Sequence, residues 1–211
     1  MELIDFILHV DQYLAEFITQ YGLWVYAILF AIIFIETGLI VMPFLPGDSL
    51  LFTAGMFAAV GMLNPWVLVI LLMIAAIAGD QVNYGVGHHI GSRVYQMNSR
   101  WIKQDHLRLA QQFFVKHGGK SIILARFMPI IRTFVPFVAG ASQMPYGHFA
   151  KYNVIGAVIW INVFVWAGYA LGNVPVIRDH VTAISLGIVV LSVLPAVVAW
   201  LLQKNKAKAS L

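Results

Sequence analysis

The segment RFMPIIRTFVPFVAG, residues 126–140, decides the fold of this chain. It is apolar enough to enter a membrane, yet it contains Arg126, Arg132 and two prolines. Proline removes a backbone donor and breaks a helix. Broken backbone at membrane depth is tolerated only where it is buried in protein or lines a wet cavity. Residues 121–140 are therefore predicted to form a re-entrant hairpin, which enters and leaves the membrane on one side.

The composition is that of an integral membrane protein. The chain has 211 residues, of which 61% are hydrophobic and only 10% are charged. Soluble domains carry about 25% charged residues, and a chain of this length has no interior large enough to hide the excess apolar surface. The absence of cysteine excludes disulfides, thiolate metal sites and thiol nucleophiles.

The basic residues are distributed very unevenly. All 13 lysines and arginines lie at or after Arg93, with six between residues 91 and 120 and three in the tail after residue 203. This pattern predicts that the central loop and the C-terminus are cytoplasmic. The basic residues lie at the ends of apolar segments rather than over a folded surface, which argues against a nucleic-acid partner.

The apolar segments predict a small set of membrane elements. A spanning helix needs about 20 mostly apolar residues, and residues 65–90, 149–172 and 182–202 meet that need. Residues 28–56 are broken by prolines and carry acidic residues, so a second re-entrant hairpin is predicted there. Residues 1–20 show helical apolar spacing and are predicted to form an amphipathic helix at the membrane surface.

The two halves of the chain resemble each other. Residues 17–22 match residues 113–118 at an offset of 96, which places Glu36-Thr37 on Arg132-Thr133. Further along, Gly55 pairs with Gly140, and the glycines at 87 and 91 pair with those at 168 and 172, at offsets of 81–85. The opposite charge of the flanking loops predicts that the repeat is inverted, as in many secondary transporters.

The sequence therefore predicts an all-α polytopic membrane protein with one membrane domain over residues 1–211. Repeat 1 covers about 1–91, and the basic loop with repeat 2 covers about 92–172. Each repeat contains an amphipathic helix, a re-entrant hairpin and a transmembrane helix. A C-terminal transmembrane helix over about 182–202 follows them.

Four ionisable residues fall within the two hairpins: Glu36, Asp48, Arg126 and Arg132. Each costs about 2.5–3.5 kcal/mol at the bilayer centre on insertion scales, so a functional polar cavity is predicted. Two guanidinium forks suit a phosphate, while the carboxylates supply countercharge or take up a proton. Alternatively, the charges only pair and staple the hairpins together. Asp48 also fits a cap on a short helix starting at Ser49.

Polar residues on the first spanning helix extend this prediction. Asp80, Asn83 and Tyr84 lie on one helical face and are predicted to line the cavity; a structural contact between Asp80 and Asn83 is the alternative. The histidines lack the spacing of a ligand set, so no metal and no cofactor are predicted.

The motifs FIETGLIVMPFLPGDSLLFTAG, GDQVNYGVGHHIG and HGGKSIILARFMPIIRTFVPFVAGASQMPYGHF resemble the DedA family of bacterial inner-membrane proteins. The resemblance runs over nearly the whole chain. It implies a role in lipid transport, above all the return of undecaprenyl phosphate across the cytoplasmic membrane, linked to the proton motive force. It also implies functional importance for Glu36, Asp48, Arg126 and Arg132, the same four residues.

The leading hypothesis is a translocase of undecaprenyl phosphate, with protons and an anionic membrane lipid as partners. In it, Arg126 and Arg132 bind the phosphate while Glu36 and Asp48 supply countercharge or proton coupling. A proton-coupled ion antiporter and a phospholipid scramblase are the alternatives. An enzyme is not predicted, because the serine–histidine arrangements of membrane lipid phosphatases are missing.

Overall fold

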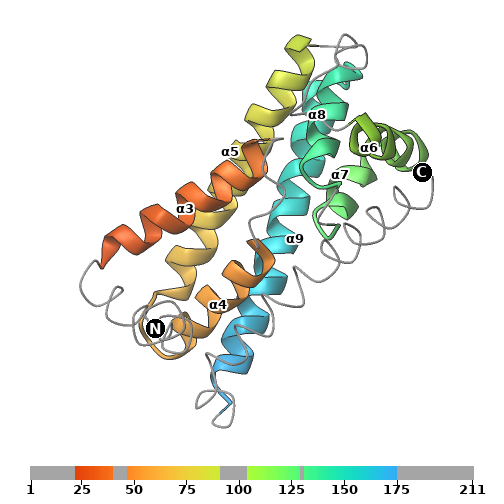
Figure 1. Cartoon of the computed structure of the whole chain (residues 1–211). Helices are drawn as coiled ribbons and strands as arrows, with labels where there is room; N and C mark the ends of the chain where they lie inside the picture. Colours follow the sequence, from red (N-terminus) through yellow and green to blue (C-terminus); the bar gives the residue numbers. More distant parts are fainter. Residues whose placement is uncertain (1–21, 40–46, 91–103, 129–130, 175–211) are drawn as a thin grey trace, which may run out of the picture. The chain divides into compact units, whose positions relative to one another are not determined.

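The computed structural model describes residues 22–39, 47–90, 104–128 and 131–174 (Figure 1). Every regular element in these ranges is a helix. In chain order they are α3 (Leu23–Gly38), α4 (Gly47–Ala59), α5 (Pro65–Ile90), α6 (Gln104–His117), α7 (Lys120–Ala125), α8 (Phe134–Ala141) and α9 (Tyr146–Gly172). The all-helical prediction is thus confirmed for this part of the chain. The helices predicted at 1–20 and 182–202, and the basic tail, lie outside the described residues.

Two helices, α5 and α9, are long and apolar enough to cross a membrane. They contain 26 and 27 residues, which at about 1.5 Å per residue exceeds the roughly 30 Å hydrocarbon core. Both leave large apolar side chains exposed, including Trp66, Ile70 and Ile74 on α5 and Val158, Ile159 and Val163 on α9. The helices predicted at 65–90 and 149–172 are confirmed, the second with an earlier start at Tyr146.

Residues 120–141 form two short helices, α7 and α8, separated by residues 126–133. α7 has six residues and α8 has eight, so neither reaches the length of a spanning helix. Arg126 is the C-cap of α7 and Thr133 the N-cap of α8. The predicted break is present between the two helices, and Pro129, one of the two prolines that predicted it, lies outside the described residues. The break predicted at Pro136 is wrong, because this proline lies in the first turn of α8, where a missing N–H costs no helical hydrogen bond.

The start of the α7–α8 segment contacts α9 near the beginning of that helix, and the end of the segment contacts α5 near its end. Gly119, just before α7, lies so close to the Tyr152 ring near the start of α9 that a Cβ would clash with it. Just after α8, the side chain of Gln143 donates a hydrogen bond to the carbonyl of His88 near the end of α5, at 3.1 Å. The turn carrying Arg126 therefore lies further along the two long helices than either end of the segment.

The chain divides into two compact units. The larger unit contains α3, α5 from Trp66 onward, α6, α7, α8 and α9 up to Val163. The smaller unit contains α4 and the last part of α9, from Phe164 onward. The prediction of one membrane domain stays a prediction.

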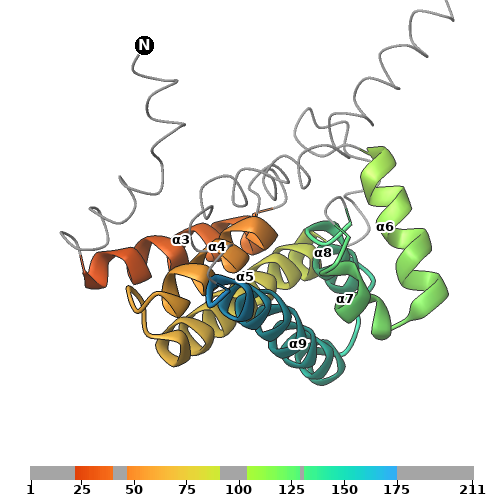
Figure 2. The same cartoon turned by 90° about the horizontal axis from the view of Figure 1, so that it is seen from below.

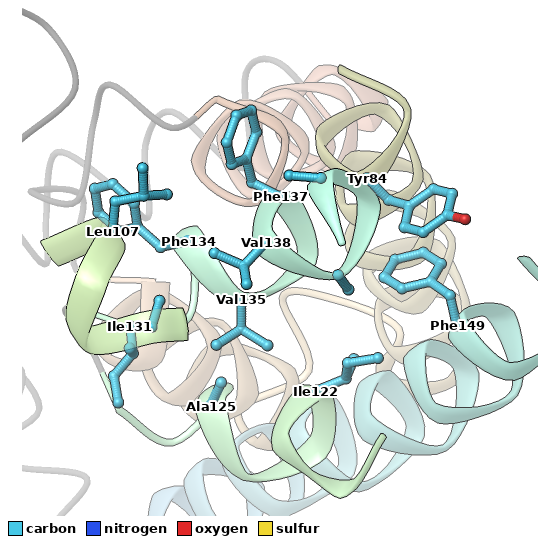
Figure 3. Close-up of a cluster of buried hydrophobic side chains, with 13 residues drawn as sticks. Tyr84, Leu107, Ile122, Ala125, Ile131, Phe134, Val135, Phe137, Val138 and Phe149 are labelled. Carbon is cyan, nitrogen blue, oxygen red and sulfur yellow. The ribbon is translucent and has the colours of Figure 1, made fainter. Parts of the chain in front are cut away.

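α8 lies at the centre of the apolar core of the larger unit (Figure 3). Its side chains Phe134, Val135, Phe137 and Val138 are all buried against residues of α5, α6, α7 and α9. Burial of one such side chain contributes about 1.5–3 kcal/mol. The amphipathic helix α6 covers α7 and α8 from outside through Leu107 and Ala110 (Figure 2).

Glycines bring two pairs of helices into backbone contact. In the larger unit, a Cβ at Gly87 of α5 would clash with the carbonyl of Phe137 in α8, and a Cβ at Gly140 of α8 would clash with the carbonyl of Tyr84 in α5. In the smaller unit the same reciprocal arrangement joins α4 and α9. A Cβ at Gly55 would clash with the carbonyl of Val165, and one at Gly168 with that of Phe52.

These two contacts have the register of the sequence repeat. Phe137 and Gly140 follow Phe52 and Gly55 by 85 residues, and Val165 and Gly168 follow Tyr84 and Gly87 by 81. The short helix after the break of each half thus packs on the long helix of the other half. This agreement supports the predicted repeat, while its inverted orientation in a membrane stays a prediction.

Candidate functional site

The two arginines of the α7–α8 turn lie at one small pocket in the larger unit. The pocket is lined by Thr37, Asp80, Arg126, Arg132, Thr133 and Trp160. These residues come from α3, α5, the α7–α8 turn and α9, so elements far apart in sequence build the site. The pocket has room for about one water molecule.

Arg126 is held by two polar partners. Its Nη2 donates to Oδ2 of Asp80 at 2.5 Å and to Oδ1 of Asn153 at 2.6 Å. Asn153 is itself oriented by a hydrogen bond from its Nδ2 to the carbonyl of Ile77, at 3.1 Å. The Nε of Arg126 is buried and has no hydrogen-bond partner among the described residues, so the guanidinium keeps one donor unused.

A glycine makes the position of Arg126 possible. A Cβ at Gly156 of α9 would lie 3.0 Å from Nε of Arg126 and 3.1 Å from its Cδ. Asn153, Gly156 and Trp160 are spaced by three, four and seven residues, which places them on one face of α9. This face carries an acceptor, a gap and an aromatic ring for the same guanidinium.

Arg132 forms the second ion pair, with Oε1 of Glu36 in the last turn of α3. The side chain of Arg132 is 9% exposed and that of Glu36 1% exposed. The repeat aligns these two residues with each other, so equivalent positions of the two halves carry opposite charges and pair directly. Together with the pair of Arg126 and Asp80, each arginine that lines the pocket is therefore paired with one carboxylate.

Both guanidinium groups lie over the ring of Trp160. The Cζ atoms of Arg126 and Arg132 are 5.7 Å and 5.4 Å from its ring centroid, within the range of cation–π attraction. Trp160 is 1% exposed. One buried ring thus contacts both cations of the pocket.

Asn83 connects the two broken segments beside the pocket. Its Nδ2 donates to the carbonyl of Thr37 at 3.1 Å and to the carbonyl of Thr133 at 2.6 Å. The two threonines are equivalent in the repeat, so one amide bridges the same position of both halves. The hydroxyl of Thr133 is buried and has no hydrogen-bond partner among the described residues. It supplies a second unused polar group at the pocket.

The structure brings most of the predicted site residues together. Glu36, Asp80, Arg126 and Arg132 meet at the pocket, and Asn83 lies beside it. Tyr84 does not line the pocket: its hydroxyl donates to the carbonyl of Met144 at 2.5 Å and its ring stacks on Phe149, with centroids 4.2 Å apart. Tyr84 therefore contributes to packing near the end of α5.

Asp48 lies in the smaller unit, as the second residue of α4. The helix begins at Gly47 rather than at Ser49, so the predicted capping position is wrong by two residues. Asp48 instead lies in the first helical turn, where a negative charge is favourable. Its predicted role in countercharge or proton coupling stays a prediction.

Asp80 is the partner of Arg126, a pairing that the sequence did not predict. Trp160, Asn153 and Thr133 were also not predicted as site residues. The shared helical face of Asn153, Gly156 and Trp160 was a usable signal. The hydroxyl of Thr133 gave no such signal, because threonine is common in turns and at helix caps for local reasons.

Residues 45–170 of this chain match the protein family described as "VTT domain". Protein DedA of Escherichia coli (strain K12) is 52% identical over 208 residues, which cover 97% of this chain and 95% of that protein. The uncharacterized membrane protein ML0287 of Mycobacterium leprae is 45% identical over 80% of this chain and 76% of its own length.

The inner membrane protein YqjA of Escherichia coli is 33% identical over 74% of this chain and 71% of its own length. No solved structure matches the fold. The matched residues include α4 through most of α9, together with both arginines of the pocket. The chain therefore belongs to the DedA family of membrane proteins and carries its VTT domain.

Proposed function

We propose that this protein moves a lipid with a phosphate head group, undecaprenyl phosphate, across the bacterial inner membrane. The head group passes through the pocket while the polyprenyl tail stays in the lipid. Similarity to YqjA, an inner membrane protein, supports this location. The exposed apolar faces of α5 and α9 support a lipid environment.

The observation that carries the proposal is the buried pair of arginines at one pocket. Arg126 and Arg132 offer planar donor forks that match phosphate oxygens. The unused Nε of Arg126 and hydroxyl of Thr133 add further groups that hydrogen-bond an anion. Thr133 is also the N-cap of α8, so the N-terminal end of this helix directs partial positive charge toward the pocket.

Each guanidinium is paired with a carboxylate, and the pocket has room for about one water. A phosphate is larger, so it enters only when Glu36 and Asp80 give up their contacts. Breaking a buried ion pair with nothing in its place costs about 3–5 kcal/mol. The phosphate must therefore replace the carboxylates on the arginines.

The hairpin geometry supports a path to the pocket from one side. Both ends of the α7–α8 segment lie at the same ends of α5 and α9, and the arginines lie in the turn between them. In the proposed membrane arrangement this segment is re-entrant from the cytoplasmic side. The sequence repeat predicts an inverted counterpart of this segment in the first half, and in the proposed mechanism the head group reaches the pocket alternately from the two sides.

The pairing of the carboxylates favours an anion over a cation as substrate. A cation site needs carboxylate oxygens that face the ion. In the pocket, Glu36 and Asp80 each contact an arginine instead. This is why a lipid phosphate ranks above a cation exchanged for protons.

The test is the movement of undecaprenyl phosphate in proteoliposomes containing wild type or Arg132→Ala, with and without a pH gradient. Arg132→Ala should abolish protein-dependent movement, because it removes one of two phosphate-binding groups and leaves Glu36 buried without its partner. Lys151→Ala is the matched control, since Lys151 is an exposed cation on α9 away from the pocket. Equal movement by wild type and Arg132→Ala would contradict the proposal, as would wild-type movement no faster than in protein-free vesicles.

A further inference from the structure

Asp80 occupies the place on Arg126 that a phosphate would take. Its Oδ2 accepts from Nη2 of Arg126 at 2.5 Å, and both side chains are 5% exposed. Asp80 lies on α5, outside the two broken segments, and among the described residues its side chain pairs with Arg126. A bound phosphate and an ionised Asp80 would therefore compete for one guanidinium.

The charges of the pocket set a condition on that competition. The charged groups that line the pocket are Asp80 from α5 and Arg126 and Arg132 from the α7–α8 turn, and Glu36 from α3 pairs with Arg132. α9 presents the neutral side chains of Asn153 and Trp160. The pairs cancel, so a phosphate monoester dianion would leave two uncompensated negative charges in a buried site. Such a site neutralises charge by binding protons rather than holding it.

We propose that Asp80 is a positioning residue that exchanges with the phosphate, and that one proton on Asp80 and one on Glu36 accompany each phosphate monoester dianion bound. The protons come from water. Each neutral carboxyl releases its guanidinium to the phosphate, and the occupied pocket is again neutral. The inference rests on the proposed function and adds the proton count and the residue that takes the second proton.

The contacts of Arg126 fit this exchange. When Asp80 is neutral, the guanidinium keeps its hydrogen bond to Asn153 and its contact with Trp160. Asn153 is fixed in turn by the carbonyl of Ile77. Arg126 thus stays in position while its ionic partner changes, which is what a replaceable carboxylate requires.

The experiment measures proton uptake on binding of farnesyl phosphate to the full-length protein in detergent. Calorimetric titrations at about pH 8, in buffers of different ionisation enthalpy, give the number of protons taken up. At that pH a phosphate monoester is close to a dianion, because its second pKa is about 6. The expected uptake is about two protons for wild type and about one for Asp80→Asn, since the asparagine is already neutral.

Glu36→Gln is the second variant and should also take up about one proton. Lys151→Ala is the control and should keep the wild-type count. Asp80→Asn should also bind farnesyl phosphate more tightly than wild type at high pH, because the phosphate no longer competes with the carboxylate of Asp80. Both neutral variants are nearly isosteric with the native residue, and their elution and melting in detergent show whether they are folded.

The outcomes separate this inference from the proposed function. Binding with a proton count unchanged in Asp80→Asn overturns the inference and leaves the proposed function standing. No binding of farnesyl phosphate by wild type contradicts both. Inorganic phosphate is the third arm: binding as tight as that of farnesyl phosphate, with the same proton counts, supports the exchange at Asp80 but contradicts a lipid as the substrate.

Discussion

The two glycine-mediated contacts, α8 on α5 and α4 on α9, share one packing register and differ in the charges next to it. In both, a glycine on each helix admits the backbone of the other, and the contacting residues obey the offsets of the repeat. Near α8, the break before the helix carries Arg126 and Arg132. In the first half, the position equivalent to Arg132 is Glu36.

This difference in charge separates the residues that stabilise the fold from those that form the candidate site. Small residues at equivalent positions are retained in both halves, because close helix packing in a membrane needs them. The charge at the break is opposite in the two halves, and the structure pairs Glu36 with Arg132 directly. The repeat thus supplies the frame, and its asymmetry in charge supplies the site.

The largest effect is expected from removing that asymmetry. Glu36→Arg places an arginine at both equivalent positions and leaves Arg132 without its carboxylate. Loss of one partner of a buried pair costs about 3–5 kcal/mol. The denaturant concentration at the midpoint of unfolding in detergent should therefore be much lower than for wild type. The double variant Glu36→Arg, Arg132→Glu restores opposite charges and should regain much of this loss. A double variant no more stable than the sum of the single changes would show that the pair is not formed.

Asn83→Ala should have the next largest effect, because it removes the amide that bridges the equivalent threonines of the two halves. The carbonyls of Thr37 and Thr133 would each lose a buried donor, at about 1–3 kcal/mol per group. Stability in detergent measures this. Asn173→Ala is the control, since the exposed Asn173 donates to the carbonyl of Tyr169, four residues earlier in the chain. Equal losses in the two variants would argue against the bridge.

The shared packing register is tested by Gly140→Val and Gly55→Val. Each adds side-chain atoms where a Cβ already meets backbone, and overpacking costs about 1–3 kcal/mol. The midpoint temperature of thermal unfolding should fall by similar amounts in both variants, because the two contacts are equivalent. Gly85→Ala is the control: a Cβ there meets nothing within 4 Å, and alanine in a helix gains about 0.5–1 kcal/mol. Loss in only one of the two valine variants would break the equivalence.

The smallest effect is expected from Trp160→Phe. A phenyl ring keeps an aromatic face under both guanidinium groups, but its cation–π attraction is weaker than that of indole, whose desolvated contacts contribute about 2 kcal/mol or more. The affinity for farnesyl phosphate should fall a few-fold while the protein stays folded. Trp160→Leu removes the aromatic face and should weaken binding further. Unchanged affinity in both variants would show that the ring only fills space.

The sequence predicted the elements better than their pairing. The apolar lengths of α5 and α9 and the arginine-bearing break could be read from composition and proline, because these are local properties. The offset of 96 even aligned Glu36 with Arg132, the pair that the structure forms. The partner of Arg126 could not be read, since Asp80 lies 46 residues away on another helix and only the packing of α7 against α5 and α9 brings them together. Asp48 was favoured as a countercharge because it falls within the first predicted hairpin.

The central claim is that Arg126 and Arg132 hold the phosphate of the lipid. Solid-state NMR tests it most directly, through dipolar coupling between the phosphorus of bound undecaprenyl phosphate and the ¹⁵N-labelled guanidinium groups of the protein in lipid bilayers. We expect dipolar coupling at hydrogen-bond range in the wild-type protein. This coupling should be reduced in Arg126→Lys and in Arg132→Lys and lost when both residues are changed. Coupling that persists in the double variant, or that is absent from wild type with the lipid bound, would contradict the central claim.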